Sequence, residues 1–156
     1  MQIDITEIAD DFPEFRAAVL IARDLAVSPA RPQGLEAEIS RCEAACRARW
    51  AGLELADIPG IAAWRRAYRA FGIKRNSYRS SVERLVKNVL AGRELARVNA
   101  FVDAYNAVSL AHVLPLGADD LDKVAGNMAF RYAREGDSFL DMAGQGEGGE
   151  AAPPKP

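Results

Sequence analysis

Three polar side chains recur at intervals of three residues inside an apolar segment in the second half of the chain. Asp103, Asn106 and Ser109 lie within residues 98–114, which are otherwise mainly apolar. On a helix this spacing places them along one stripe, and a helix that is apolar nearly all round is a buried one. Buried polar groups need hydrogen-bond partners. These side chains either tie down neighbouring backbone, which the residue types alone favour, or shape a small polar pocket.

A turn and an acidic cluster follow this segment. We expect Pro115 to stop the helix and Gly117 to turn the chain. Asp119, Asp120 and Asp122 come directly afterwards.

Charge is distributed unevenly along the 156 residues, although the formal net charge is only −2. Residues 1–61 hold 6 basic and 11 acidic residues, residues 62–97 hold 10 and 2, and residues 98–156 hold 4 and 9. The middle segment is therefore a basic block within an acidic chain. Such a block either attracts a polyanion or is a solvated helix face that pairs with the acidic flanks.

The sequence Ser80-Ser81-Val82-Glu83 within this block predicts a capped helix start. Free backbone N–H groups at a helix start favour anions, and adjacent cations strengthen that preference. The segment is either a site for an RNA phosphate or an ordinary capped helix with solvated cations. The candidate RNA-binding residues are Lys74, Arg75, Arg79, Arg84 and Lys87.

Hydrophobic periodicity predicts helices over 35–53, 61–71 and 82–90, the last with an apolar stripe of Val82, Leu85, Val86, Val89 and Leu90. Pro59 suits the first turn of the second helix, and Gly72 suits its end. Residues 15–27 are predicted to form a strand, with a helix as the alternative because of their alanines. Weaker strands are expected within 2–8, 127–134 and 138–142, the last two as a hairpin.

The residues do not favour metal or nucleophilic chemistry. Cys42 and Cys46 share the apolar face of the first long helix and are interpreted as small core residues. His112 is the single histidine, and we interpret it as structural. No phosphate loop, nucleophile elbow or zinc-protease motif is present. We therefore expect no metal and no cofactor, and no catalytic residue can be assigned from the sequence.

Residues 98–142 resemble a known domain. Asp103 and Asn106, then Pro115, then Asp120-Leu121-Asp122 with Gly126, are similar to the B3/B4 domain of the bacterial phenylalanyl-tRNA synthetase beta chain. Phe130-Arg131-Tyr132-Ala133 and the segment 135–139 extend the similarity, which is weaker over 59–97. The chain looks like a free-standing member of that family.

The resemblance implies an α+β fold, in which helices pack on a small mixed β-sheet that here lacks its C-terminal strands. It also implies a tRNA-associated module that hydrolyses mischarged aminoacyl-tRNA in trans. The implied pocket residues are Asp103, Asn106, Gly117, Asp119 and Asp120. Gly117 stands where the synthetases carry a pocket histidine, so this chain departs from the family's editing pattern. The alternative function is a small-molecule or protein-binding module that kept the fold without RNA binding or catalysis.

Composition predicts one domain over residues 1–143 and a flexible Gly/Pro-rich tail over 144–156. The expected partner is tRNA or aminoacyl-tRNA, with no DNA and no membrane. Unpaired strand edges at the end of the domain would favour association between chains, so a homo-oligomer is retained as an alternative. The acidic start of the chain lacks the features of a signal peptide, and two cysteines make no disulfide framework, so we expect a cytoplasmic protein.

Overall fold

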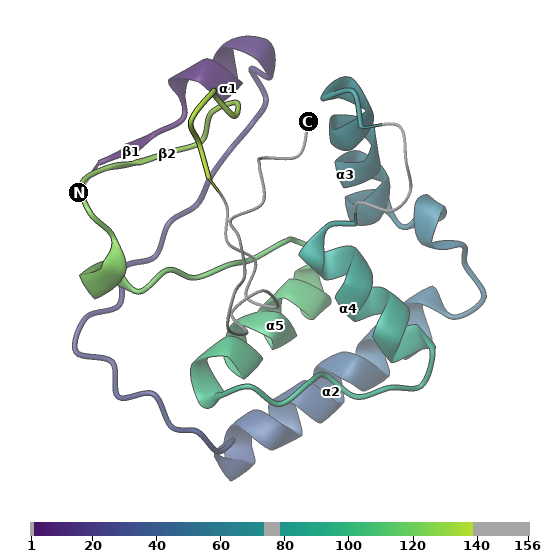
Figure 1. Cartoon of the computed structure of the whole chain (residues 1–156). Helices are drawn as coiled ribbons and strands as arrows, with labels where there is room; N and C mark the ends of the chain where they lie inside the picture. Colours follow the sequence, from purple (N-terminus) through teal and green to yellow (C-terminus); the bar gives the residue numbers. More distant parts are fainter. Residues whose placement is uncertain (1, 74–78, 139–156) are drawn as a thin grey trace, which may run out of the picture. The chain divides into compact units, whose positions relative to one another are not determined.

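Contacts within the chain divide it into two units. The computed structural model describes residues 2–73 and 79–138 (Figure 1). One unit comprises residues 22–118, and the other combines residues 1–21 with 119–156. The predicted tail over 144–156, and residues 139–142 of the predicted final strand, lie outside the described residues.

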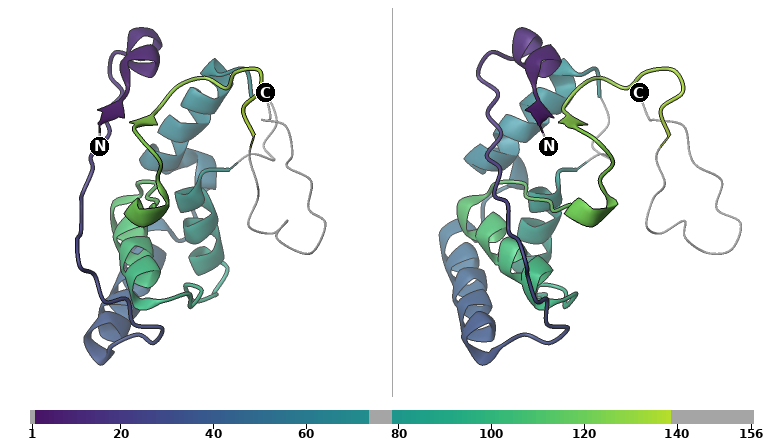
Figure 2. Two further views of the ribbon diagram at one scale, coloured as in Figure 1. Left: turned by 60° about the vertical axis from the view of Figure 1, so that its left-hand side comes forward. Right: turned by 90° about the vertical axis from the view of Figure 1, so that its left-hand side faces the viewer.

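Three helices form the core of the unit 22–118. They are α2 (Gln33–Trp50), α4 (Ser81–Leu90) and α5 (Ala100–His112), and each packs against the other two (Figures 1 and 2). Helix α4 contributes Val82, Val86 and Val89, all fully buried, because apolar residues at this spacing share one face. The predicted apolar stripe of α4 is therefore confirmed. Cys42 and Cys46 of α2 lie in the same core, as expected.

The short 3-10 helix η1 (Leu55–Asp57) leads into α3 (Pro59–Ala70), which begins with proline in its first turn and ends before Gly72 (φ +83°). Both features confirm the predicted boundaries. Gly60 lies against the end of α5, where a Cβ on Gly60 would stand 2.4 Å from the carbonyl oxygen of Val113. Val113 itself adopts a left-handed conformation (φ 54°) and ends α5. The helix thus stops before Pro115, the residue we expected to end it.

Helix α5 is less buried than its composition suggests. Asp103, Ala107, Ser109 and Leu110 are buried, whereas Val108 is 51% exposed. The expectation of a helix buried nearly all round is wrong within this unit, because α2 and α4 cover only part of its circumference.

The other unit contains β1 (Ile3–Asp4), α1 (Thr6–Asp11), η2 (Leu121–Lys123) and β2 (Met128–Ala129). The two strands lie side by side and parallel, with Ile3 opposite Met128 (Figure 1). Side chains add further links across the same segments. The Glu7 carboxylate accepts a hydrogen bond from the Tyr132 backbone N–H and pairs with Arg134, and the Phe15 and Phe130 rings lie 5.7 Å apart.

Two strand predictions are wrong. Residues 15–27 form neither strand nor helix, and five of their large apolar side chains are 47–91% exposed. An apolar run becomes a strand only where a neighbouring backbone pairs with it, and the described residues offer none to residues 16–27. The strand predicted over 127–134 is limited to Met128–Ala129, which pairs with β1. Residues 139–142, the other side of the predicted hairpin, lie outside the described residues.

The fold class is α+β, as predicted, with five α-helices and a two-stranded parallel sheet in the described residues. Among these residues, no helix combines the length and apolar character that crossing a membrane requires.

Candidate nucleic-acid interface

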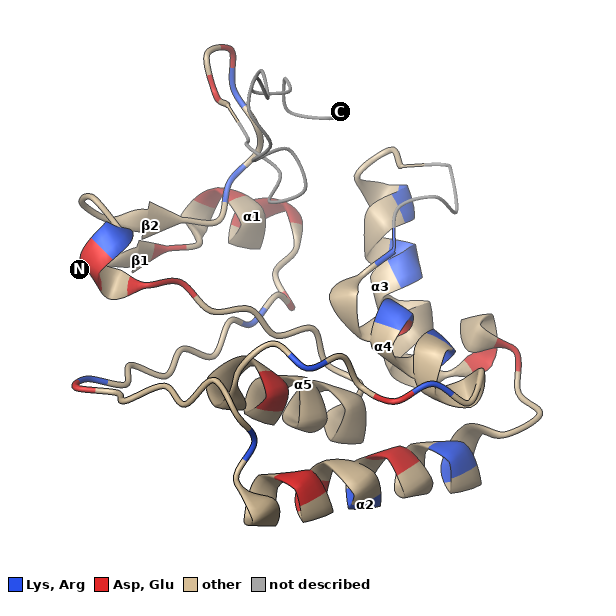
Figure 3. Cartoon of the chain, turned by 60° about the horizontal axis from the view of Figure 1, so that its bottom comes forward, with Lys and Arg blue, Asp and Glu red and all other residues tan. Residues whose placement is uncertain are grey.

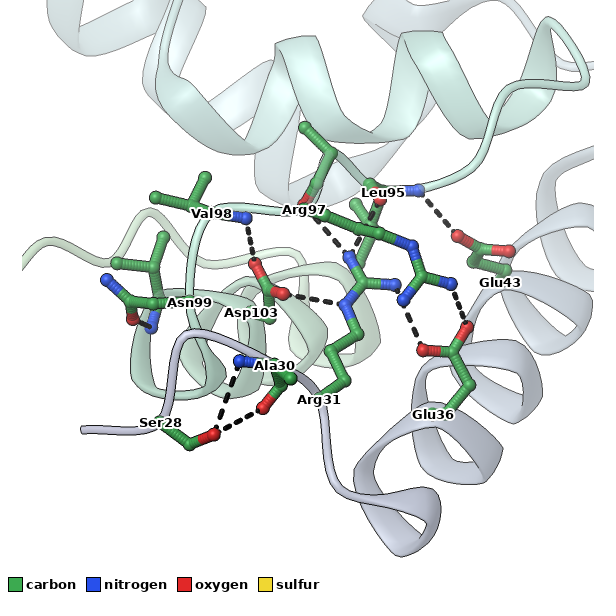
Figure 4. A network of polar contacts seen from close by, with 12 residues as sticks. Ser28, Ala30, Arg31, Glu36, Glu43, Leu95, Arg97, Val98, Asn99 and Asp103 are labelled. Carbon is green, nitrogen blue, oxygen red and sulfur yellow. Dashed lines mark hydrogen bonds and ion pairs between the residues drawn. The ribbon is translucent and has the colours of Figure 1, made fainter. Parts of the chain in front are cut away.

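The first turn of α5 places Asp103 in the interior. Asn99 caps this helix, because its side-chain oxygen accepts a hydrogen bond from the Val102 N–H. Asp103 follows one turn later and is 1% exposed. Its Oδ1 accepts the Val98 N–H at 2.9 Å, and its Oδ2 accepts Nε–H of Arg31 at 2.6 Å (Figure 4). Both carboxylate oxygens are therefore occupied by the protein itself.

Arg31 lies at the centre of this network. Its Nη2 donates to the carbonyl oxygens of Leu95 and Ala96, each at 2.9 Å. Its Nη1 lies 3.6 Å from Glu36, a carboxylate that also pairs with Arg97 at 2.7 Å. Arg31 thereby joins the start of α2 to the connection between α4 and α5 (Figure 4). Arg31 was not predicted as a structural residue, because an isolated arginine before Pro32 carries no distinctive local pattern.

The remaining predicted pocket residues are more exposed. Asn106 is half-buried, one turn after Asp103, and Gly117 is exposed, with no atom within 4 Å of where a Cβ would stand. Asp119 and Asp120 are exposed and belong to the other unit. Asp120 caps η2 there by accepting the Asp122 N–H at 3.1 Å.

Residues associated with metal or thiol chemistry are dispersed. His112 is exposed at the end of α5. Burial raises the pKa of both the Cys42 and the Cys46 thiols above the ordinary value, which favours the protonated and unreactive form. Among residues 2–73 and 79–138, no three His, Cys, Asp or Glu side chains gather as metal ligands would.

The basic block separates into two groups of cations. Arg97 pairs with Glu36, while Arg65 and Arg79 pair with Glu83. The other group comprises exposed side chains that have no ion-pair partner within the described residues. Within this group, the basic face is the four cations that lie on helices, Arg66 and Arg69 on α3 and Arg84 and Lys87 on α4. Arg93, also exposed, follows α4 and is not included.

Figure 3 shows lysine and arginine positions along α3 and α4 in blue. The two helices are linked by the ion pair between Arg65 and Glu83. Each helix carries its two face residues three positions apart, so they are neighbours on the helix surface. Lys74 and Arg75, also predicted to bind RNA, lie outside the described residues.

Glu83 departs from its predicted role at the start of α4. Ser80 accepts the Glu83 N–H, at 3.4 Å, which confirms one half of the predicted capping box. The Glu83 side chain does not return to the backbone of Ser80 among the described contacts. It is 2% exposed and accepts from Arg65 at 2.8 and 3.3 Å. A buried carboxylate is stabilised far more by a guanidinium than by one backbone N–H.

The sequence profile of the B3/4 domain matches residues 63–148. This chain belongs to the B3/4 domain family. The family's domain occurs in the beta chain of phenylalanyl-tRNA synthetase, so the chain is related to a tRNA-synthetase-associated domain. No curated protein and no solved structure matches the chain. The matched residues of this B3/4 domain include residues 63–70 of α3 and the whole of α4 and α5, and therefore the basic face.

Proposed function

We propose that this B3/4 domain protein binds tRNA or aminoacyl-tRNA through the basic face. The observation that carries the proposal is four exposed cations on two linked helices, none with an acidic partner in the described chain. The family supports tRNA as the polyanion, because its domain occurs in a tRNA synthetase.

The charge around the basic face favours this role. The segment 62–97 contains only two acidic residues, and Glu83 is buried beneath two arginines. Unpaired surface cations attract phosphates and release counterions when the phosphates bind. Cations already neutralised by neighbouring carboxylates would contribute much less.

Ester hydrolysis in trans is the finer part of the proposal. Water adds to the ester carbonyl carbon, the bond to the ribose oxygen breaks, and the ribose hydroxyl recovers a proton. Such a reaction depends largely on holding the water and the aminoacyl end in place. We propose Asn106 and Gly117 of the unit 22–118 as pocket residues, with Asp103 holding α5 in position.

The binding proposal is tested by charge reversal at the basic face. Replacing Arg66, Arg69, Arg84 and Lys87 with glutamate should weaken tRNA binding by more than about tenfold at low salt. It should also reduce the slope of log K against log salt by about two or more, since each phosphate contact contributes roughly 0.7–0.9.

A matched control carries the same change in net charge at exposed cations that do not belong to α3 or α4. The control residues are Arg23, Arg41, Arg49 and Lys123. This variant should keep most of the tRNA affinity. Equal losses of tRNA affinity in the two variants would show that binding depends only on net charge and not on the basic face. Absent tRNA binding by the unmodified protein would overturn the proposal. Function that survives reversal of the basic face would favour a small-molecule or protein-binding module.

Hydrolysis is tested with a panel of mischarged tRNAs incubated with the purified protein. The amino acid remaining on each tRNA is followed over time. Asn106→Ala should slow release of the amino acid without changing tRNA affinity. Release no faster than the spontaneous rate for every tRNA would leave binding without catalysis.

A further inference from the structure

Two arginines from different elements meet at one buried carboxylate beside the basic face. Arg65 of α3 places Nη2 2.8 Å from Oε1 of Glu83 and Nε 3.3 Å from Oε2. Arg79, just before α4, places its Nε 3.3 Å from the same Oε1. Two positive charges are thus fixed close together by a single negative one.

Arg65 by itself satisfies the carboxylate. Its Nε and Nη2 contact the two oxygens of Glu83 separately, which is the two-point arrangement typical of strong arginine–carboxylate pairs. Glu83 therefore has no need of Arg79 as a second partner. Holding a second arginine costs side-chain entropy and adds repulsion between like charges. Because two guanidinium groups face one carboxylate, the cluster carries one uncompensated positive charge.

The two guanidinium groups keep donors available for a ligand. Among the described residues, no partner engages Nη1 of Arg65 or either terminal nitrogen of Arg79. Their side chains are 26% and 37% exposed, whereas Glu83 is 2% exposed. The carboxylate is therefore withdrawn from solvent, while the cations that it holds remain accessible.

Neighbouring groups add to the positive and polar character of this cluster. Arg84 of the basic face directly follows Glu83 in α4, and Tyr68 lies on α3 one turn after Arg65. Burial raises the pKa of Tyr68 and the Glu83 carboxylate raises it further, while Arg84 opposes both. The cluster thus adjoins Arg84 of the basic face.

We propose that Arg65 and Arg79 form a clamp for one backbone phosphate of RNA, and that Glu83 is the positioning residue that holds the clamp. The inference rests on the proposed function, because it assigns one phosphate contact within the proposed RNA interface. Arginine suits this task, since its planar fork donates to two phosphate oxygens at once.

Glu83→Gln separates the clamp from general charge attraction. The substitution removes one negative charge, so attraction between net charges alone would strengthen tRNA binding. The clamp requires the opposite result, because the amide holds the two arginines less firmly. We expect affinity for tRNA to fall by about tenfold, the loss typical of one charge-assisted contact. Affinity that is equal or higher in Glu83→Gln would overturn the clamp.

Arg79→Lys provides a test that does not depend on the buried position. It keeps the charge and removes the fork, so the clamp predicts a loss of about fivefold or more in tRNA affinity. The matched control is Arg23→Lys, an exposed arginine outside α3 and α4, which should leave affinity unchanged. Equal affinities for both lysine variants would contradict the clamp. Thermal unfolding of each variant verifies that the fold is retained.

Failure of the clamp and failure of tRNA binding give different results. If tRNA binds but Glu83→Gln and Arg79→Lys bind as well as the unmodified protein, the clamp fails and the proposed function stands. If no tRNA binds, inorganic phosphate still tests the clamp by NMR of the arginine Nε–H groups. Shifts at Arg65 and Arg79 that exceed those at Arg66 would support it, and uniform or absent shifts would overturn it.

Discussion

Arg31 and Asp103 lie 72 residues apart in the sequence and form an ion pair of 2.6 Å between Nε and Oδ2. Their side chains are 3% and 1% exposed. The pair also carries hydrogen bonds to backbone groups of the connection between α4 and α5. It therefore fixes the start of α5, the helix that contains Asn106.

Removing one member of this pair should destabilise the protein strongly. Arg31→Met leaves the Asp103 charge buried without its partner, which typically costs about 3–5 kcal/mol. Urea unfolding followed by circular dichroism measures the free energy of unfolding. The control is Arg41→Met, whose exposed pair with Glu38 should contribute no more than about 1 kcal/mol. Similar losses in the two variants would contradict a structural role for Arg31.

Glu43 should protect the Leu95 amide, in the connection between α4 and α5, from hydrogen exchange. Its Oε1 accepts the Leu95 N–H at 2.6 Å, and both residues are buried. Glu43→Ala leaves this donor unsatisfied, at a cost of about 1–3 kcal/mol. Hydrogen exchange at the Leu95 amide should accelerate in Glu43→Ala and less so in Glu43→Gln, which keeps an acceptor. An unchanged exchange rate in the alanine variant would argue against this hydrogen bond.

Gly60 should resist even the smallest side chain. Its Cβ would stand 2.4 Å from the Val113 carbonyl oxygen and 2.9 Å from a Val113 side-chain carbon. Gly60→Ala is expected to destabilise by about 1–3 kcal/mol, as overpacking typically does. Gly34→Ala is the matched control, because it lies in α2 with nothing within 4 Å. That substitution should be neutral or stabilising by up to about 1 kcal/mol, and equal midpoints in urea would refute the close approach.

Asp137 should titrate well below an ordinary aspartate. Hydrogen bonds from Arg131 at 2.7 Å and from the Arg134 backbone N–H lower its pKa from the ordinary value of 3.8. A lowered folded pKa means that the interaction is fully present above pH 3.8 and is lost as the pH falls below it. NMR titration of the side-chain carboxyl carbon measures the shift. Arg131→Gln should return the pKa toward 3.8, and an ordinary value in the unmodified protein would contradict the contact.

The two buried cysteines should react slowly while the chain is folded. Burial raises the pKa of Cys42 and Cys46 above the ordinary 9.0, so little thiolate is present near neutral pH. A chromogenic disulfide reagent at pH 8 should modify neither thiol rapidly in buffer and both in concentrated urea. Rapid modification of the folded protein would show that the core of α2 opens readily.

The four longer helices, α2 to α5, are encoded locally and were predicted from the sequence, whereas the short helix α1 (Thr6–Asp11) was not. The valine stripe and Ser80 predicted α4, while Pro59 and Gly72 marked the ends of α3. Helix periodicity and caps involve residues within a few positions of one another, so the pattern is readable without knowing the fold. The α+β class and the family followed from the same segments together with the motif around Asp103.

Residues 15–27 show where the sequence is insufficient. Their apolar character fits a strand, yet strand formation depends on a neighbouring backbone that the segment does not specify. Conversely, the two short strands Ile3–Asp4 and Met128–Ala129 pair across most of the chain. That pairing follows from tertiary contacts and not from the strength of either strand.

By itself, the sequence determined the four longer helices, the cysteines in the core and the excess of cations over 62–97. Only the tertiary structure decided which charged side chains remain available to a ligand. It pairs the buried Glu83 with Arg65 and Arg79, and the buried Asp103 with Arg31. The physical reason is that helix formation is governed by neighbours a few residues away. The partner of a buried charge is chosen by burial and distance between segments that the chain brings together only when it folds.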